Sequence, residues 1–415
     1  MLYPLSYRRR KLSLAGVAGA PADRKGATPP GPASRQREPA EVRVRDTPIV
    51  RAAVQYGYGA PLVVEELELD PPRAGEVLVR MAASGVCRSD WHEMRGIHER
   101  PVPGVLGHEG SGVIEQVGEG VDGLRPGDHV VLSWLPYCGT CRRCASGRPN
   151  LCENLEVFDA GFLGDGTVRF HKGDLPIHSN VPSSFAERTV VPAGTAIRVD
   201  PALPLEQVAL LGCAVMTGVG AVLNTARVRP GESVVVIGCG GVGLSVIQGA
   251  RIAGAWPIVA VDVVDSKLDL ARRLGATETV LGTGEDPEAA IRDVLPGGAD
   301  FSFEALGRVA TIELATRVTA PGGTAVLVGM ASPEARAAID ALTLTVQERT
   351  ITGCWYGSCV PPRDFPRLAE LVVAGELRLD AMIGRTFDLE GINEALGLFE
   401  QAPEARSVIL YGDRP

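Results

Sequence analysis

Four closely spaced cysteines are the clearest chemical signal in the sequence. Cys138, Cys141, Cys144 and Cys152 follow the pattern Cys-x2-Cys-x2-Cys-x7-Cys. Four thiolates at this spacing can complete a tetrahedral zinc shell that has no open position. Because such a shell leaves no place for water or a substrate, the pattern predicts a structural metal site.

A second, incomplete set of metal ligands precedes this cluster. Cys87 supplies a thiol, and His108 supplies an imidazole inside a Gly-His-Glu-Gly-Ser-Gly run at 107–112. Two protein ligands are too few for a tetrahedral metal site, so a third ligand must come from elsewhere in the chain. Catalytic zinc sites typically combine three protein ligands with a fourth position for water or substrate. The pair therefore predicts a catalytic metal.

A glycine-rich sequence at 238–243 indicates a coenzyme site. It contains Gly238, Gly240 and Gly243, follows an apolar run at 233–237 and precedes another at 242–253. Such glycines let the backbone approach a pyrophosphate at a helix N-terminus. Asp262 lies 22 residues beyond Gly240, where a carboxylate accepts the hydroxyls of the adenosine ribose. Because this carboxylate would repel a 2′-phosphate, the pattern favours NAD over NADP.

The elements that must position these residues change character along the chain. From residue 49 to the four cysteines, short apolar runs such as 77–79 and 112–114 alternate with Pro- and Gly-containing turns, which is typical of β structure. Beyond residue 230, strands alternate with helices, which predicts βαβ units and a parallel sheet. The predicted strands there are 233–237, 258–261, 301–304, 325–328 and 407–410, and the predicted helices are 242–253, 267–274 and 365–373.

Composition limits the class of protein. With 415 residues, of which 45% are hydrophobic, the chain can form two or three globular domains. The net charge of −9 argues against a nucleic-acid partner. No uncharged apolar run reaches the ~18 residues that a membrane span needs. Nine cysteines, four of them at a metal-binding spacing, fit reduced thiolates in the cytoplasm better than a disulfide scaffold.

Residues 1–45 differ from the rest of the chain. They carry ten Lys and Arg against three Asp and Glu, a charge of +7, which leaves −16 for residues 46–415. Pro, Ala and Gly dominate, so this segment cannot build a core, and we expect a disordered basic extension. A basic run at 8–11 before an apolar stretch imitates an export signal, but the apolar part is short and broken by glycine.

Together these features resemble the zinc-containing alcohol dehydrogenases of the medium-chain dehydrogenase/reductase family. The motifs that carry the resemblance are Gly-Val-Cys-Arg-Ser-Asp at 85–90, Gly-His-Glu-x2-Gly-x5-Gly at 107–118, the four-cysteine lobe, Leu-Gly-Cys at 211–213 and the coenzyme glycines. The resemblance extends from about residue 49 to the C-terminus. It implies an α/β fold with a GroES-like β catalytic domain at 46–214 and 356–415. A doubly wound Rossmann coenzyme domain is implied at 215–355.

By position, the resemblance completes the catalytic metal site and implies two zinc ions per chain. Cys213 would be the third ligand beside Cys87 and His108, although a buried free cysteine could instead belong to the core. Glu109 resembles the acid behind the zinc that can temporarily replace bound water. Asp90 resembles the carboxylate that orients the histidine ligand.

The resemblance also implies reversible oxidation of a primary or secondary alcohol by NAD. Ser89 resembles the hydroxyl that takes the alcohol proton, and His92 resembles the base that passes it to solvent through the nicotinamide ribose. The other implied coenzyme contacts are Arg88 and Arg406 at the pyrophosphate, Lys267 at the adenosine ribose, and Thr217 and Val242 behind the nicotinamide. Trp134 and Trp355 align with substrate-lining positions, although both could be packing aromatics.

Alternatives remain at this stage. The same scaffold fits a thiol-adduct formaldehyde dehydrogenase of the mycothiol type, or an enzyme that keeps NAD bound and regenerates it with another acceptor. A glutathione adduct is disfavoured, because Glu156 stands where glutathione-using members carry an arginine. A zinc-stabilised binding protein without activity is the third alternative. The 60 residues between Cys152 and Cys213 resemble the long-loop branch of the family, which is commonly dimeric, so we expect a homodimer.

Overall fold

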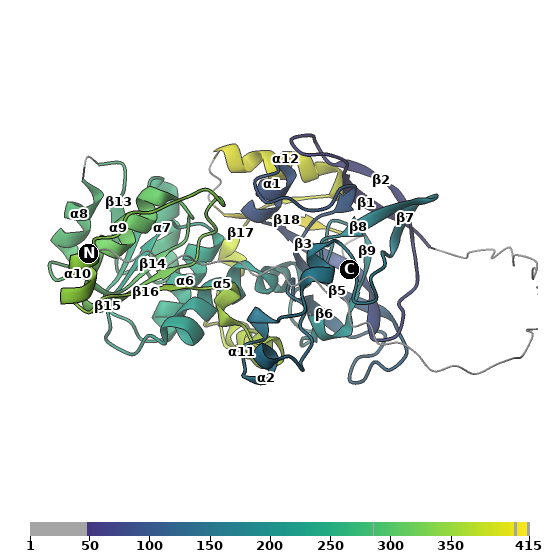
Figure 1. Ribbon diagram of the computed structural model, residues 1–415, viewed down its shortest axis with the longest axis horizontal. Helices are drawn as coiled ribbons and strands as arrows, with labels where there is room; N and C mark the ends of the chain where they lie inside the picture. The colour runs from purple at the N-terminus through teal and green to yellow at the C-terminus, as the bar shows by residue number, and fades with distance from the viewer. Residues whose placement is uncertain (1–47, 285, 402–404, 413–415) are drawn as a thin grey trace, which may run out of the picture. The chain divides into compact units, whose positions relative to one another are not determined.

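The computed structural model of the protein describes residues 48–284, 286–401 and 405–412 (Figure 1). The predicted basic extension, residues 1–45, lies outside them. The described chain forms a mostly antiparallel group of strands and a parallel sheet flanked by helices, which confirms the predicted α/β class.

Five strands close a small barrel in the order β1-β2-β7-β8-β4. Their bounds are β1 Ile49–Gln55, β2 Val63–Leu69, β4 Gly104–Val105, β7 Phe170–Lys172 and β8 Leu175–Ser179. In the β1–β2 pair, Val50 is opposite Leu67, and both side chains are buried. Branched apolar residues in such pairs stabilise a sheet by packing across the strands. The barrel therefore has a core of its own.

A second, mostly antiparallel sheet, with strand order β10-β6-β5-β3-β18-β17, carries the first candidate metal ligands. Its strands are β3 Glu76–Val86, β5 Glu109–Val117, β6 His129–Leu132, β10 Ala196–Arg198, β17 Ile383–Phe387 and β18 Arg406–Leu410, with β9 Arg188–Pro192 also paired to β3. In the β3–β5 register, Gly85 is opposite Glu109. This register brings the end of β3, followed by Cys87, beside the start of β5, preceded by His108.

The parallel sheet has the strand order β13-β12-β11-β14-β15-β16 (Figure 1). The strands are β11 Val234–Ile237, β12 Ile258–Asp262, β13 Glu278–Leu281, β14 Ala299–Glu304, β15 Thr319–Leu327 and β16 Thr350–Gly353. The helices between them are α6 Gly241–Ile252, α7 Asp265–Leu274, α8 Pro287–Val294, α9 Val309–Val318 and α10 Ala341–Val346. The strand order reverses between β11 and β14, and ligands of such sheets bind where the order reverses.

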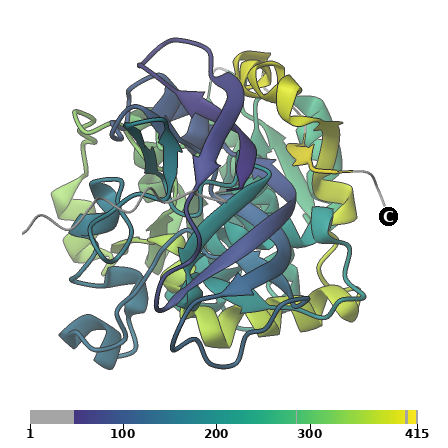
Figure 2. The ribbon, with the colours of Figure 1, turned by 90° about the vertical axis from the view of Figure 1, so that its right-hand side faces the viewer.

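The remaining elements connect or cover the two groups of strands (Figure 2). The helices are α1 Arg88–Met94, α2 Arg142–Ala145, α3 Glu156–Asp159, α4 Leu205–Val208, α5 Ala214–Gly220, α11 Pro361–Val373 and α12 Ile392–Gly397. Short 3-10 turns lie at Pro149–Leu151, Ala193–Thr195, Ala209–Gly212, Tyr356–Ser358, Asp380–Met382, Leu389–Gly391 and Leu398–Gln401, and a π turn lies at Ala221–Ala226. Within one continuous core, Val215 and Val219 of α5 pack with Ile247 of α6.

All eight elements predicted beyond residue 230 are present, within a few residues of the expected bounds. In the same part of the chain, the strands β13, β16 and β17 and the helices α8, α9, α10 and α12 were not predicted. The domain limits at 214/215 and 355/356 stay a prediction. No single helix in the described chain has the length and apolarity to cross a membrane, although the bent pair Leu205–Gly212 and Ala214–Ala226 meets that test together.

Candidate active site

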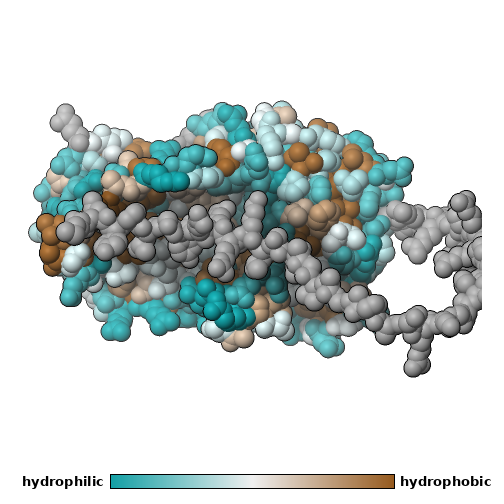
Figure 3. Space-filling model, viewed as in Figure 1, coloured by the Kyte–Doolittle hydropathy of each residue, from teal (hydrophilic) through white to brown (hydrophobic). Residues whose placement is uncertain are grey.

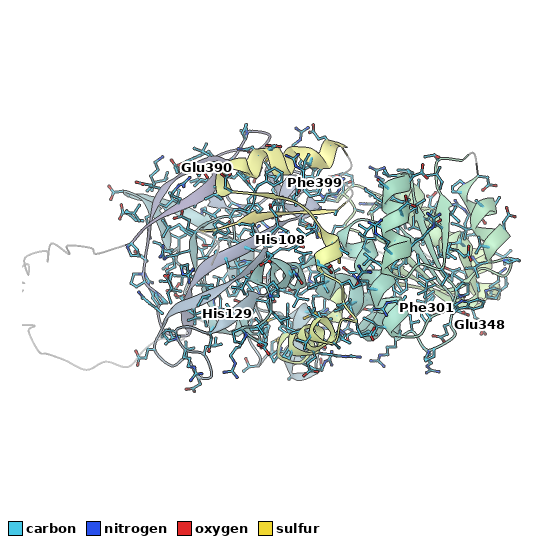
Figure 4. All side chains as sticks on the ribbon, turned by 180° about the vertical axis from the view of Figure 1, so that it is seen from behind. His108, His129, Phe301, Glu348, Glu390 and Phe399 are labelled. Carbon is cyan, nitrogen blue, oxygen red and sulfur yellow. The ribbon has the colours of Figure 1, made fainter. Side chains whose placement is uncertain are left out.

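Three side chains that could ligate a metal converge between the two groups of strands, although they are distant in the sequence. The ligand atoms of Cys87, His108 and Cys213 all lie within 4.8 Å of one another, and all three residues are buried (His108 is labelled in Figure 4). The β3–β5 register brings the first two together. Cys213 joins them because it directly precedes α5, which packs against α6. We call these three residues the ligand triad.

The carboxylate of Asp90 fixes two members of the ligand triad. Its Oδ1 lies 2.8 Å from His108 Nδ1, and its Oδ2 accepts a 2.8 Å hydrogen bond from the Cys87 backbone N–H. An ionised carboxylate only accepts, so Nδ1 of the imidazole carries the proton and Nε2 is left for a metal. Asp90 is fully buried, which makes this arrangement rigid.

The ligand triad fits a catalytic zinc ion. Two thiols and one imidazole are the donor set of one type of catalytic zinc site. The Cys213 thiol hydrogen-bonds Cys87 and lowers the Cys87 pKa well below its usual value, so one thiolate is favoured before any metal binds. All three side chains line a cavity of about 230 Å³, which gives a substrate access to the fourth position.

Glu109 lies directly behind the ligand triad. Its Oε1 accepts from Arg406 Nη2 at 2.7 Å and from the Ala214 backbone N–H at 3.0 Å. Burial raises the pKa of Glu109 to about 7, although the Arg406 charge acts in the opposite direction. Among the described residues, Glu109 Oε2 and Arg406 Nε have no hydrogen-bond partner. The carboxylate therefore keeps one oxygen uncommitted beside the metal position.

The four-cysteine lobe fits a structural zinc ion. Its four sulfurs lie within 4.8 Å of one another, with Cys138–Cys144 and Cys141–Cys152 Sγ distances of 4.0 Å. Zn–S bonds of about 2.3 Å place tetrahedral sulfurs about 3.8 Å apart. Backbone N–H groups also donate to the sulfurs, as Cys141 N does to Cys138 Sγ at 3.2 Å, and these bonds lower the Cys138 pKa to about 5. These bonds favour a thiolate at Cys138, whereas burial raises the pKa of Cys144 to about 12.

One face of α1 is directed at the cavity. Ser89, His92 and Glu93 occupy positions i, i+3 and i+4 of this helix, which share one face, and all three line the cavity. Ser89 Oγ lies 3.8 Å from Cys87 Sγ, beside the ligand triad. Burial lowers the pKa of His92, and the neighbouring His98 and Arg88 lower it further. The neutral imidazole, which accepts protons, is therefore favoured.

Each glycine of the coenzyme loop is needed for a different structural reason. Gly238 has a φ of +97°, which favours glycine, and a Cβ on Gly243 would lie 1.7 Å from the Gly238 carbonyl oxygen. Gly240 has no atom within 4 Å of its Cβ position, so space is open where a pyrophosphate would approach. A Cβ on Gly241 would lie 3.0 Å from Arg406 Cζ, which places this guanidinium against the loop.

Asp262 ends β12 beside this loop. Its Oδ2 accepts from Cys239 N at 2.7 Å, and its Oδ1 accepts from Val263 N at 2.8 Å, so the carboxylate also fixes the glycine loop. The other predicted coenzyme contacts line the same cavity, together with both predicted tryptophans. They are Arg88, Thr217, Val242, Lys267, Arg406, Trp134 and Trp355. Asp262 itself is not a lining residue.

The sequence interpretation of Glu156 needs correction. Glu156 is exposed at the start of α3 and does not line the cavity, whereas the predicted repulsion required it to face an adduct at close range. The short helix after the four-cysteine lobe turns its first residue to solvent. The charge argument against a glutathione adduct therefore does not follow from the structure.

Several lining residues were not predicted, among them the polar side chains of Glu93, Arg100 and Asn180. Glu93 could have been found from its i+4 spacing after Ser89 had α1 been recognised as a helix. Arg100 and Asn180 come from loops and carry no comparable signal. Cys239, Cys354 and Cys359 are buried, as expected for apolar thiols.

Comparisons with known proteins agree with this arrangement. Residues 73–201 match the family described as the alcohol dehydrogenase GroES-like domain, and residues 241–374 match the zinc-binding dehydrogenase family. The NDMA-dependent alcohol dehydrogenase of Amycolatopsis methanolica is 39% identical over 366 residues, which are 87% of this chain and 98% of that protein. The S-(hydroxymethyl)glutathione dehydrogenase of Escherichia coli is 39% identical over 369 residues, which are 87% and 99% of the two chains.

A solved structure extends the similarity to the fold. The crystal structure of benzyl alcohol dehydrogenase from Acinetobacter calcoaceticus matches with a TM-score of 0.84 and 32% identity, covering 88% of this chain and all of that chain. Family matches, sequence identity and fold agree with the motifs. This chain therefore belongs to the zinc-containing alcohol dehydrogenases of the medium-chain dehydrogenase/reductase family.

Proposed function

We propose that this enzyme catalyses reversible hydride transfer between a primary or secondary alcohol and NAD, with a catalytic zinc at Cys87, His108 and Cys213. The observation that carries the proposal is that one cavity is lined by the ligand triad, by Ser89 and by the coenzyme glycines Gly240 and Gly241. A zinc-stabilised binding protein would not need this combination.

When bound, zinc supplies a Lewis acid for the alcohol oxygen, and NAD supplies the hydride acceptor. Residues of the chain would then accept and transfer the proton of the alcohol. Ser89 would accept it from the alcohol, and His92, whose neutral form is favoured by burial, would take it on towards solvent. Asp90 holds His108 and Cys87 in place throughout, and Trp134 and Trp355 line part of the cavity.

The test is an assay of NADH formation by purified zinc-loaded enzyme with a panel of alcohols, and of NADH consumption with the matching aldehydes. Turnover that depends on zinc and NAD supports the proposal. Binding of NAD without turnover of any alcohol or thiol adduct would contradict it. Parallel assays without added NAD, and with NDMA, would detect permanently bound coenzyme.

A second candidate is thiol-adduct formaldehyde dehydrogenase activity. It is favoured by the 39% identity to an S-(hydroxymethyl)glutathione dehydrogenase, and the exposed position of Glu156 removes the charge objection. Formaldehyde oxidation should be measured with glutathione, with mycothiol and without thiol. A strict requirement for either thiol would place this function first, whereas thiol-independent oxidation of simple alcohols would exclude it as the main activity.

Asp262→Ser is expected to weaken NAD use and to relax the rejection of NADP. A like-charge pair at ~4 Å near a protein surface costs about 4 kcal/mol before screening, so the ratio of kcat/KM for NADP to that for NAD should rise at least roughly tenfold. The control is Asp265→Ser, because Asp265 lies three residues later and is exposed, whereas Asp262 is buried and accepts a hydrogen bond from the glycine loop. An unchanged coenzyme ratio in Asp262→Ser would remove this residue from the coenzyme site.

His92→Gln is expected to lower kcat mainly at neutral pH and to recover at alkaline pH, where hydroxide replaces the base. In the parent enzyme the His92 pKa is lowered, so the proton-accepting form persists at neutral pH and is lost only as the pH falls through that lowered value. The measurement is kcat against pH for both proteins. A loss of equal size at every pH would argue against a relay role.

We also propose a homodimer in a reducing compartment such as the cytoplasm, where all nine free cysteines would stay reduced. The candidate interface is α10 with the edge strand β16. Leu342 and Val346 of α10 are 72% and 67% exposed, and Figure 3 shows hydrophobic surface at the end of the molecule where Figure 1 labels α10. Exposed apolar side chains beside an unpaired strand edge favour pairing with another chain.

Light scattering should give the mass of a dimer, and Leu342→Lys should shift the protein towards the monomer, because a buried lysine would oppose association. Leu281→Lys is the matched control, since Leu281 is a partly exposed residue at the opposite sheet edge, β13. A tetramer at low concentration, or equal effects of the two variants, would contradict this interface.

A further inference from the structure

One wall of the active-site cavity is polar and charged. Glu93, Arg100 and Asn180 all line it. Asn180 Nδ2 donates to Glu93 Oε2 at 2.5 Å, and Arg100 Nε donates to Glu93 Oε1 at 3.3 Å. Glu93 is 7% exposed, so this carboxyl is held among protein atoms. We call these three residues the polar wall.

The geometry of α1 places the polar wall on the substrate side. Glu93 follows Ser89 by four residues on the same helix face, where side chains are about 5–6 Å apart at Cβ. Arg88 instead contacts Phe399, with its Nη2 donating to the Phe399 carbonyl at 3.3 Å. A substrate whose hydroxyl lies beside Ser89 would therefore reach the polar wall within a few carbon atoms.

The backbone holds the polar wall in a fixed position. The N–H of Asn180 donates to the Val105 carbonyl at 3.2 Å. Tyr58 Oη donates to the Arg100 carbonyl at 2.6 Å, and Gln55 Nε2 donates to the Glu93 carbonyl at 3.2 Å. All three side chains are thus attached to anchored main chain. Such preorganisation is what a recognition site requires.

The polar wall keeps unused hydrogen-bonding capacity. Each carboxylate oxygen has two lone pairs, and an asparagine amide has a second N–H and a carbonyl oxygen. Burial raises the pKa of Glu93 to about 7; the charges of His108 and Arg100 act in the opposite direction, whereas the Asp90 charge raises the pKa further. An alkyl chain against this wall would remove water from polar groups and return no hydrogen bonds, whereas a hydroxyl could both donate and accept.

Another part of the cavity lining differs in character. Trp134 and Trp355 meet edge to face with ring centroids 5.2 Å apart. They suit the carbon skeleton of a substrate and offer it little hydrogen bonding. A molecule that contacts both the tryptophans and the polar wall therefore needs an apolar body and a polar end.

We propose that Glu93, Arg100 and Asn180 form a hydrogen-bonding subsite that selects alcohols carrying a second hydroxyl group a few carbons from the reacting one. The proposal rests on the proposed alcohol dehydrogenase function and names its substrate class. It makes these three side chains specificity-determining residues.

The test compares α,ω-diols of three to six carbons with 1-alkanols one carbon longer, in which a methyl group replaces the distal hydroxyl. In each pair the substrates have the same length. At one chain length the kcat/KM of the diol should exceed that of the alkanol by about tenfold or more. This difference is counted after a factor of two is removed, because the diol has two identical reactive ends. The reason is that sites built to bond a hydroxyl reject analogues that lack it.

Three variants locate the preference. Glu93→Met and Asn180→Leu should each lower the ratio of kcat/KM for the diol to that for the alkanol about tenfold, because an apolar side chain packs favourably against the methyl end instead. Glu99→Gln is the control and should keep the parent ratio, since Glu99 is exposed on the same segment and does not line the cavity. Zinc content and Tm of each variant show whether the fold is intact.

The outcomes separate this inference from the function. Equal kcat/KM for diol and alkanol at every length, or a preference that survives in both apolar variants, would overturn the subsite alone. If neither series is oxidised and the full panel of alcohols and thiol adducts also gives no turnover, the alcohol dehydrogenase proposal falls. Binding of the same diols and alkanols to the protein loaded with zinc and NAD then decides the subsite, and equal affinities would overturn it.

Discussion

Ser89→Ala is expected to lower kcat by about two to four orders of magnitude, the usual contribution of a positioned proton-transfer group. Its Oγ lies beside the ligand triad and on the cavity face of α1, so its loss interrupts the first step of proton removal from the alcohol. The measurement is single-turnover oxidation at saturating alcohol and NAD. Zinc content and NAD affinity should be unchanged, because Ser89 is not assigned to either site.

Ser89→Thr is the matched control, since it keeps the hydroxyl and adds one methyl group. It should retain most of the activity, which distinguishes a chemical role of the hydroxyl from a packing role. A Ser89→Ala variant that keeps more than a tenth of the parent kcat would show that the proton leaves by another route.

Asp90→Asn is expected to weaken zinc binding at the ligand triad by about 10- to 100-fold, as loss of a carboxylate behind a metal-bound histidine usually does. The substitution places an amide against His108 Nδ1 or against the Cys87 N–H, and one of these two hydrogen bonds must be lost. Elemental analysis should find two zinc ions per parent chain. After mild chelation the variant should retain one, in the four-cysteine lobe.

Asp269→Asn serves as the control, because Asp269 is an exposed residue of α7 with only a surface ion pair. It should bind zinc as the parent does. Two zinc ions retained by Asp90→Asn under the same chelation would show that Asp90 does not support the site. Fewer than one zinc per chain in fully active parent protein would contradict the metal assignment itself.

Features that depend on the spacing of residues close together in the sequence could be predicted from the sequence. The four-cysteine lobe is such a case, because its ligands lie within 15 residues and backbone N–H groups from the same turns donate to the sulfurs. The glycine loop is another, since strand, loop and helix are consecutive. The role of Cys213 came only from the family resemblance, because no local pattern connects it to Cys87 or His108.

The features that were not predicted depend on pairing between strands that are distant in the sequence. Asn180 reaches Glu93 only because β4 pairs with β8 in parallel, a pairing between strands over 70 residues apart that has no local signature. The error about Glu156 has the same origin. Its position in the sequence was read correctly, but the direction in which the short helix α3 turns its side chain depends on packing, which spacing alone does not report.

The pairing of β18 with β3 has a consequence for the order of assembly during synthesis. Arg406, in the first position of β18, bonds the Val86 carbonyl across 320 residues of sequence. The parallel sheet is therefore translated completely before the strand that completes the antiparallel sheet leaves the ribosome. A nascent chain can form its nucleotide-binding lobe early, but it must leave the edge of β3 open until the end, when an aggregation-prone edge is finally covered.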